Sequence, residues 1–233
     1  MGSLMLSFRK YLSEKAAKGG FDYEDVVNAK LKQYGLQPEN VRSAGSSADA
    51  PDGTIHAGGK HHNLEIKKDK SAMMGQLELK YSDEKGWHIG DRSKNKYPKT
   101  AAHIERHFLP DVNKKWKKPS GDYDTDLKMG NIYKDHPNTD PIKDHYGKDR
   151  KTPYIQIGKS GLHHMGNDEG RLGVPELNGK TQFRARMKYR GTNKKTGKKG
   201  YGSLVTFVLK DHKPSSVDID KHAELLGKKH GMR

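Results

Sequence analysis

The strictest constraint in this sequence is an alternation of apolar and basic side chains between Phe183 and Arg190. The apolar positions are Phe183, Ala185, Met187 and Tyr189, and the basic positions are Arg184, Arg186, Lys188 and Arg190. Successive residues of a strand face opposite sides of a sheet, so this pattern predicts a half-buried strand with a basic outer face. A basic loop over 191–200 and a return strand over 201–209 complete a predicted C-terminal β-hairpin.

Helical and strand-like segments are interspersed along the rest of the chain. Apolar spacing predicts helices over 4–18, 22–34, 71–80, 100–108 and 216–226. Alternating or short apolar runs predict strands over 52–57, 61–68, 86–89 and 154–157, the first two joined at Gly58-Gly59. This order of elements predicts the α/β class, with a mixed central sheet flanked by helices.

The polarity of the chain changes along its length. A length of 233 residues suggests one domain, or one domain with a sizeable elaboration. Residues 91–152 are polar and interrupted by proline and glycine, so we expect a polar insertion or a substrate-binding lobe there. Residues 1–90 are then the N-terminal part of the core, and residues 153–233 complete it with strands, the basic hairpin and a terminal helix.

The charge of the chain indicates a polyanionic partner. The sequence has 45 Lys and Arg against 29 Asp and Glu, a formal net charge of +16. Basic side chains replace the condensed counterions of nucleic acids, so DNA or RNA is the expected partner, and a merely solvated basic surface is the alternative. The absence of cysteine excludes disulfide scaffolds, cysteine zinc sites and a thiol nucleophile. We expect no membrane span and a cytoplasmic protein.

Two carboxylates and one ammonium group are predicted to meet at the edge of the first hairpin. Glu65 and Lys67 lie two positions apart on one strand and therefore share a face. Asp52 begins the neighbouring strand, 13 residues before Glu65. Carboxylate oxygens suit a hard divalent cation, Mg²⁺ or Mn²⁺, and such a set suits hydrolysis of a phosphodiester. Lys67 would orient the attacking water or stabilise the transition-state charge.

A third acid lies on the helix predicted over 22–34. The apolar stripe of this helix is formed by Tyr23, Val26, Val27, Leu31 and Tyr34. Glu24 lies at the edge of the stripe, where an unpaired acid is costly. We therefore expect Glu24 to complete the metal site, directly or through a water.

This order of residues is similar to that of a known superfamily. Glu24 on a helix, Pro51-Asp52 and Glu65-Ile66-Lys67 on the following strand resemble the PD-(D/E)XK nucleases, which have the restriction-endonuclease-like fold. The opening helix also resembles that of archaeal-type Holliday-junction resolvases and of many restriction enzymes. The resemblance implies Asp52 and Glu65 as metal ligands, with the Ile66 carbonyl as a third. It also implies catalytic roles for Lys67, Glu24 and Gln76, and products with a 5′-phosphate and a 3′-hydroxyl.

Basic clusters supply candidate DNA contacts. Those of the predicted hairpin are Arg184, Arg186, Lys188, Arg190, Lys194, Lys195, Lys198 and Lys199. Their arrangement favours contact with a DNA groove or backbone over the alternative of a basic edge that discourages strand pairing. Trp116 stands among four lysines and would stack on an exposed base, or else anchor the polar lobe to the core.

Other motifs offer alternatives that we consider weaker. His103 and His107 have the helical spacing of a zinc site, but no third ligand is evident in the sequence. The pairs His61-His62 and His163-His164 would suit the histidine base of an HNH or His-Me nuclease, without the surrounding pattern. Gly158-Lys159-Ser160-Gly161 lacks the first glycine of a phosphate-binding loop, so we expect no nucleotide cofactor.

Together these features predict a metal-dependent DNA endonuclease of a phage or bacterial mobile element. Its substrate would be double-stranded or branched DNA, and cleavage would be sequence-specific or structure-specific. Cutting two strands needs two sites, so a homodimer is expected. The competing hypothesis is a non-catalytic nucleic-acid-binding protein that uses the basic hairpin.

Overall fold

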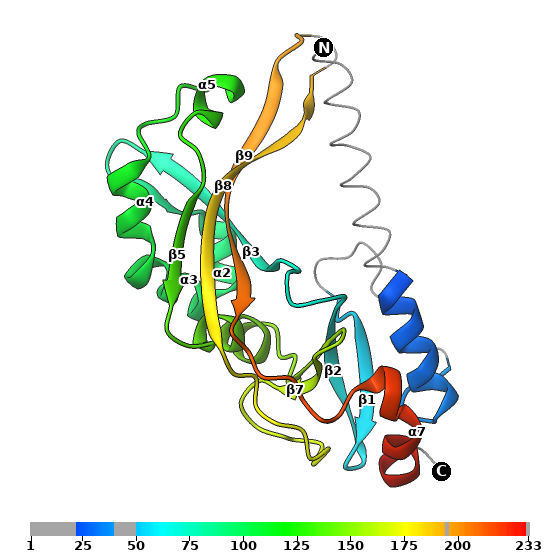
Figure 1. Cartoon of the computed structure of the whole chain (residues 1–233). Helices are drawn as coiled ribbons and strands as arrows, with labels where there is room; N and C mark the ends of the chain where they lie inside the picture. The colour runs from blue at the N-terminus through cyan, green and yellow to red at the C-terminus, as the bar shows by residue number, and fades with distance from the viewer. Residues whose placement is uncertain (1–21, 40–49, 194–195, 232–233) are drawn as a thin grey trace. The chain divides into compact units, whose positions relative to one another are not determined.

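The computed structural model describes residues 22–39, 50–193 and 196–231 (Figure 1). These residues form two compact units, each assembled from separate stretches of the chain. In its described part, the first unit comprises 22–39, 50–70, 152–177 and 213–231, and the second unit comprises 71–151 and 178–212. The second unit is therefore inserted into the first at two places. The predicted helix over 4–18 lies outside the described residues.

The first unit is a four-stranded mixed sheet with helices. Its strands are β1 (Gly53–Ala57), β2 (Lys60–Lys67), β6 (Tyr154–Ile157) and β7 (Gly161–His164), in the order β1-β2-β6-β7. Strands β2 and β6 are parallel, and the other neighbours are antiparallel. Gly58 and Gly59 have φ angles of 58° and 75°, which glycine adopts without strain, and they form the tight turn between β1 and β2.

Two helices supply the remaining apolar side chains of the first unit. One is helical over 22–33, and the other is α7 (Ile219–His230). Val27, Leu31 and Ile219 are fully buried in one cluster with Leu64 and Tyr154 of the sheet. Burial of this apolar surface is the main stabilising contribution to the unit.

A fully buried glutamine joins three elements of the first unit. Gln156 of β6 donates hydrogen bonds to Tyr23 Oη (3.2 Å) and to Asp218 Oδ1 (2.9 Å). Its Oε1 accepts from the backbone N–H of Ile219 at 3.2 Å. The amide thus satisfies its own polar atoms and fixes the N-terminus of α7 next to the helix at 22–33.

The second unit is built on a fully antiparallel sheet in the order β4-β3-β9-β8-β5. Its strands are β3 (Met74–Ser82), β4 (Gly86–Ile89), β5 (Ile132–His136), β8 (Lys180–Thr192) and β9 (Lys199–Lys210). The helices are α2 (Asp91–Lys96), α3 (Pro98–His107), α4 (Leu109–Lys115), α5 (Tyr123–Leu127) and α6 (Asp140–Lys143), followed by the π-helical turn η1 (Asp144–Asp149). Helices α3 and α4 lie on one side of the sheet (Figure 1).

Aromatic side chains fill the core of the second unit. Phe108 stacks on Phe183 with ring centroids 5.3 Å apart, and Phe183 meets Phe207 edge-on at 5.7 Å. Trp87 and Trp116 are in T-shaped contact at 5.1 Å. Such pairs add a favourable electrostatic contribution to the apolar area that they bury.

The α/β class and the first hairpin are confirmed, as is the long basic hairpin of β8 and β9. The predicted helix over 71–80 is wrong. Leu77 and Leu79 are buried on one face of β3, which pairs with β9, so strand pairing to a distant segment outweighs the local helical spacing. The predicted division is also different from the observed one, because 71–90 and 178–212 join the insertion rather than the first unit. No helix in the described ranges is long and apolar enough to cross a membrane.

Candidate active site

The candidate site lies where β1 begins and β2 ends. Gly53 pairs with Leu64, and this register brings Asp52 beside the last residues of β2. The backbone N–H of Ile66 donates to Asp52 Oδ2 at 2.9 Å and fixes the carboxylate at the sheet edge. The N–H and C=O of one residue point to the same side of a strand, so the Ile66 carbonyl is directed toward that edge too.

Lys67 lies between two carboxylates. Its Nζ is 3.5 Å from Asp52 Oδ2 and forms an ion pair with Glu65 Oε1. The Glu65 side chain is only 2% exposed, and those of Asp52 and Lys67 are 15% and 17% exposed. A buried carboxylate is stable only when its charge is compensated, and Lys67 provides that compensation here.

Glu24 of the helix at 22–33 is electrostatically part of this group. Partial burial, followed by the charge of Asp52, raises the pKa of Glu24 to about 7, with a smaller contribution from Glu65 and against the opposing charge of Lys67. Burial is the larger cause, and the contribution of Asp52 places Glu24 within electrostatic reach of that carboxylate. A role for Glu24 in a metal site stays a prediction.

Asn28 joins the helix to the start of β1. Its Nδ2 donates to the backbone oxygens of Glu24 (2.9 Å) and Asp52 (3.0 Å). A Cβ at Gly53 would lie 2.6 Å from Asn28 Oδ1, so glycine is required for this close approach. The sequence interpretation did not include Asn28, although it lies one helical turn after Glu24. Val26 was assigned to the buried stripe but is 49% exposed, because it faces away from Val27 and Leu31.

The donor atoms of the site fit a hard divalent cation better than a transition metal. Asp52, Glu65 and Glu24 offer carboxylate oxygens, and the Ile66 carbonyl faces the same edge. A divalent cation would also compensate the negative charge of these carboxylates. The three carboxylates are not drawn into one compact cluster. In the described part of the chain, the one group of three or more ligand side chains within 4.8 Å of one another is His103, His107 and His136.

Gln76 lies in the second unit and not among these residues. It is an exposed residue of β3, paired with Thr206 of β9. Its expected place on a helix directly after the Lys67 strand is wrong because no helix forms there. The structure thus brings together Glu24, Asp52, Glu65 and Lys67 within one unit and leaves Gln76 in the other.

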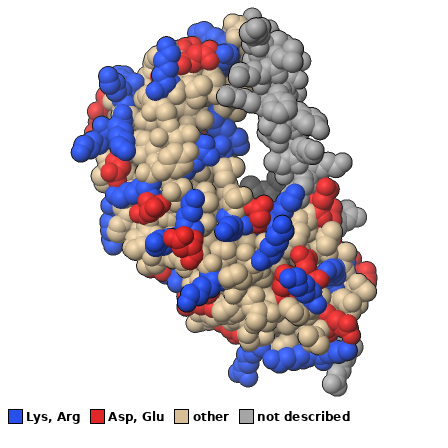
Figure 2. Space-filling view, in the orientation of Figure 1, with Lys and Arg blue, Asp and Glu red and all other residues tan. Residues whose placement is uncertain are grey.

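The basic face predicted for β8 is present. Arg184 and Arg186 are half-buried on the face opposite Phe183, and Lys188 and Arg190 are exposed. The Arg184 guanidinium lies over the Tyr133 ring, 5.6 Å from its centroid, in a cation–π contact. Lys194 and Lys195 lie outside the described residues. In Figure 2, basic side chains are spread over the visible face with fewer acidic ones between them.

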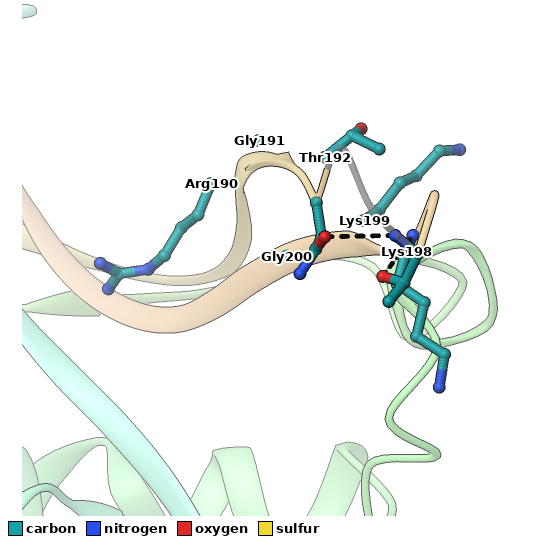
Figure 3. A pocket seen from close by; sticks show the side chains of 8 residues that line it. Arg190, Gly191, Thr192, Lys198, Lys199 and Gly200 are labelled. Carbon is teal, nitrogen blue, oxygen red and sulfur yellow. Dashed lines mark hydrogen bonds between the residues drawn. The ribbon is translucent and has the colours of Figure 1, made fainter.

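An open hollow of about 610 Å³ lies at the end of the hairpin, and the residues that line it include Arg190, Lys198 and Lys199. The basic side chains there point in different directions (Figure 3). Lys199 is paired with Asp124 at 2.6 Å, whereas Lys198 is exposed. The arrangement suits an extended polyanion better than a single small anion.

Trp116 is not available to stack on a base. It is 3% exposed, it contacts Trp87, and its Nε1 donates to the Gly130 carbonyl at 3.0 Å. The prediction of a DNA-contacting tryptophan is therefore wrong, and the alternative of a core anchor is correct. The four flanking lysines are exposed because the tryptophan faces inward.

Two histidines of the rival nuclease chemistry are buried in structural roles. His62 is 7% exposed, with Nε2 3.2 Å from the Ala57 carbonyl and its ring edge-on to Tyr154. His163 is fully buried, with Nε2 3.2 Å from the Ser160 carbonyl. These contacts do not favour a histidine base at the first hairpin.

Comparisons with family models, with curated proteins and with solved structures found no match to this chain. The function must therefore be argued from the residues of the site and from their geometry.

Proposed function

We propose that this protein is a metal-dependent DNA endonuclease whose active site is formed by Asp52, Glu65 and Lys67 of the first unit, assisted by Glu24. The observation that carries the proposal is the convergence of two carboxylates on one lysine at the edge of a mixed sheet. The order helix, Asp52 strand and Glu65-Ile66-Lys67 strand is also that of the restriction-endonuclease-like nucleases that the sequence resembles.

Asp52 and Glu65, with the Ile66 carbonyl, would hold Mg²⁺ or Mn²⁺. A bound divalent cation neutralises the phosphate and lowers the pKa of a coordinated water. Glu24 supplies a third carboxylate at the margin of this set. In the reaction, a water oxygen bonds to phosphorus while the bond to the 3′ oxygen breaks. The attacking water gives up a proton to solvent and the 3′ oxygen takes one from solvent, which leaves a 3′-hydroxyl and a 5′-phosphate.

Lys67 would have two successive partners. Without substrate, its ammonium group compensates the carboxylates of Glu65 and Asp52. When a cation takes over that compensation, the ammonium is released to donate to a phosphate oxygen and to stabilise charge that develops there.

The second unit would hold the DNA. The exposed side of β8 offers Arg184, Arg186, Lys188 and Arg190, which can neutralise several phosphates. Basic side chains of this kind position a duplex without reading its sequence. A homodimer would place two such active sites on the two strands of one duplex.

The experiment is a cleavage assay on supercoiled, linear, single-stranded and four-way-junction DNA, with Mg²⁺ or with EDTA. Wild-type protein should cut at least one substrate only in the presence of the metal. Glu65→Ala and Lys67→Ala should stop cutting but keep DNA binding, and Lys68→Ala, an exposed lysine directly after the strand, should cut normally. Absence of metal-dependent cleavage on every substrate would refute the proposal.

The second candidate function is DNA binding without catalysis. The basic face of β8 favours it, because that face would serve a binder as well as a nuclease. This candidate predicts tight DNA binding by wild type, Glu65→Ala and Lys67→Ala alike, with no strand cleavage by any of them.

A further inference from the structure

Three histidines meet in the second unit, apart from the candidate active site. His103 and His107 lie one turn apart on α3, and His136 is the last residue of β5. Their ring centroids are separated by 5.1 to 5.8 Å, and one ligand nitrogen from each lies within 4.8 Å of the others. The sequence suggested only the first two, because His136 is distant along the chain.

The orientation of His103 is fixed by a carboxylate. Its Nε2 lies 2.8 Å from Asp144 Oδ2, and the Asp144 side chain is only 8% exposed. The other nitrogen, Nδ1, is buried and has no hydrogen-bond partner within the described ranges. An imidazole that donates one N–H to a carboxylate and presents its second nitrogen is the usual arrangement of a metal-bound histidine.

The three rings are also close enough to share one ion. A neutral imidazole nitrogen carries a lone pair that can bind a metal, and one nitrogen from each ring lies within 4.8 Å of the others.

We propose that His103, His107 and His136 bind one divalent transition-metal ion, with Zn²⁺ as the favoured ion. Imidazole nitrogen suits Zn²⁺, Cu²⁺ and Ni²⁺, whereas Mg²⁺ prefers oxygen ligands. Tetrahedral Zn²⁺ with Zn–N distances of about 2.0–2.1 Å needs its nitrogens about 3.4 Å apart. The ligand nitrogens would have to move closer than their present separations, and a water would take the fourth position.

The ion would fasten α3 to the end of β5. His136 also lies edge-on to Phe183, with ring centroids 5.8 Å apart, so the site is connected to the aromatic core of the unit. The site does not depend on the nuclease proposal, because none of its ligands belongs to the first unit.

The test is Zn²⁺ binding by full-length protein freed of metal with a chelator. The Glu65→Ala background removes a ligand of the proposed Mg²⁺ site, so binding there cannot be mistaken for binding at the histidines. One equivalent should bind, and the melting temperature should rise by about 5 °C or more at 100 times the Kd. His107→Gln should weaken binding at least about 100-fold, and the matched control His88→Gln should not.

A spectroscopic arm keeps the proposal testable if the variant fails to fold. X-ray absorption of the Zn²⁺-loaded Glu65→Ala protein should show three imidazole ligands and one oxygen. Absence of a one-equivalent site, equal affinity in His107→Gln, or a spectrum dominated by oxygen ligands would overturn the proposal, whatever the outcome of the cleavage assay.

Discussion

The two units of this chain hold their clusters of ionisable side chains on different secondary-structure elements. In the first unit, Asp52, Glu65 and Lys67 come from the two strands of one hairpin, and the ligand atoms are hard oxygens. In the second unit, His103 and His107 come from a helix and His136 from a strand, and the ligand atoms are nitrogens. The two proposed sites would therefore select different cations.

The cores of the two units differ as well. The first unit packs mainly aliphatic side chains, such as Leu31, Leu64 and Ile66, between helices and a mixed sheet. The second packs stacked and edge-on aromatic rings between short helices and an antiparallel sheet. Each unit therefore has its own core, and we expect damage to one core to leave the other in place.

Core truncations should give the largest effects and test this separation. Phe183→Ala should cost about 3–5 kcal/mol and Leu31→Ala about 2–5 kcal/mol, because both side chains are fully buried. Hydrogen exchange followed by mass spectrometry should show faster exchange confined to the unit that carries the substitution. Faster exchange across both units in either variant would contradict the separation and indicate one cooperative core.

A substitution in the proposed active site should reduce the cleavage rate with little effect on stability. Asp52→Asn keeps an acceptor for the Ile66 N–H but removes the charge, so single-turnover cleavage should fall about 10²–10³-fold, or 2.7–4 kcal/mol, with little loss of stability. Asp69→Asn, a nearby acid beyond the end of β2, is the matched control. Cleavage by Asp52→Asn at the wild-type rate would remove the first unit's carboxylates from the mechanism.

Much of the first unit could be predicted because its signals are local. The turn at Gly58-Gly59, the burial of Leu64 and Ile66, and the register that brings Asp52 to Glu65 all arise within one short hairpin. The half-buried position of Glu24 at the edge of the apolar stripe could be predicted as well, because it follows from helical spacing alone.

The second unit was harder to predict because its contacts are distant in sequence. Strand β3 is paired with β9, far along the chain, and the sequence between Ser71 and Lys80 gives no indication of this pairing. Trp116 was assigned to DNA because of its neighbouring lysines, whereas its burial depends on Trp87 and Gly130. The third histidine, His136, joins α3 only after β5 pairs with β8.

The basic face of β8 should give a tenfold effect or less. Lys188→Gln combined with Arg190→Gln removes two exposed charges, so affinity for duplex DNA at about 0.15 M salt should fall roughly 5–10-fold. The slope of log K against log salt should decrease by about 2. Lys221→Gln with Lys229→Gln removes the same charge from α7 of the first unit and should change neither quantity. An equal loss of DNA affinity in both double variants would show that binding depends on the net charge of the protein and not on this face of β8.

The smallest expected effect is the contribution of Glu24, in the first unit, to the pH dependence of stability. The pKa of Glu24 rises from 4.5 to about 7 on folding, so the folded state holds its proton more tightly than the unfolded state does. This contribution is fully present below pH 4.5 and is lost as the pH rises toward 7. The Glu24→Gln variant cannot lose this stabilisation, because glutamine does not titrate. The melting temperature of the variant minus that of wild type, both measured in EDTA, should therefore increase by about 2–4 °C between pH 4.5 and 7.5, after allowance for solvent screening. Glu39→Gln, an exposed acid beyond the same helix, should give a constant difference. A constant difference for Glu24→Gln as well would mean that neither burial nor the charge of Asp52 raises the pKa of this carboxyl, and the first unit's site would then be limited to its hairpin.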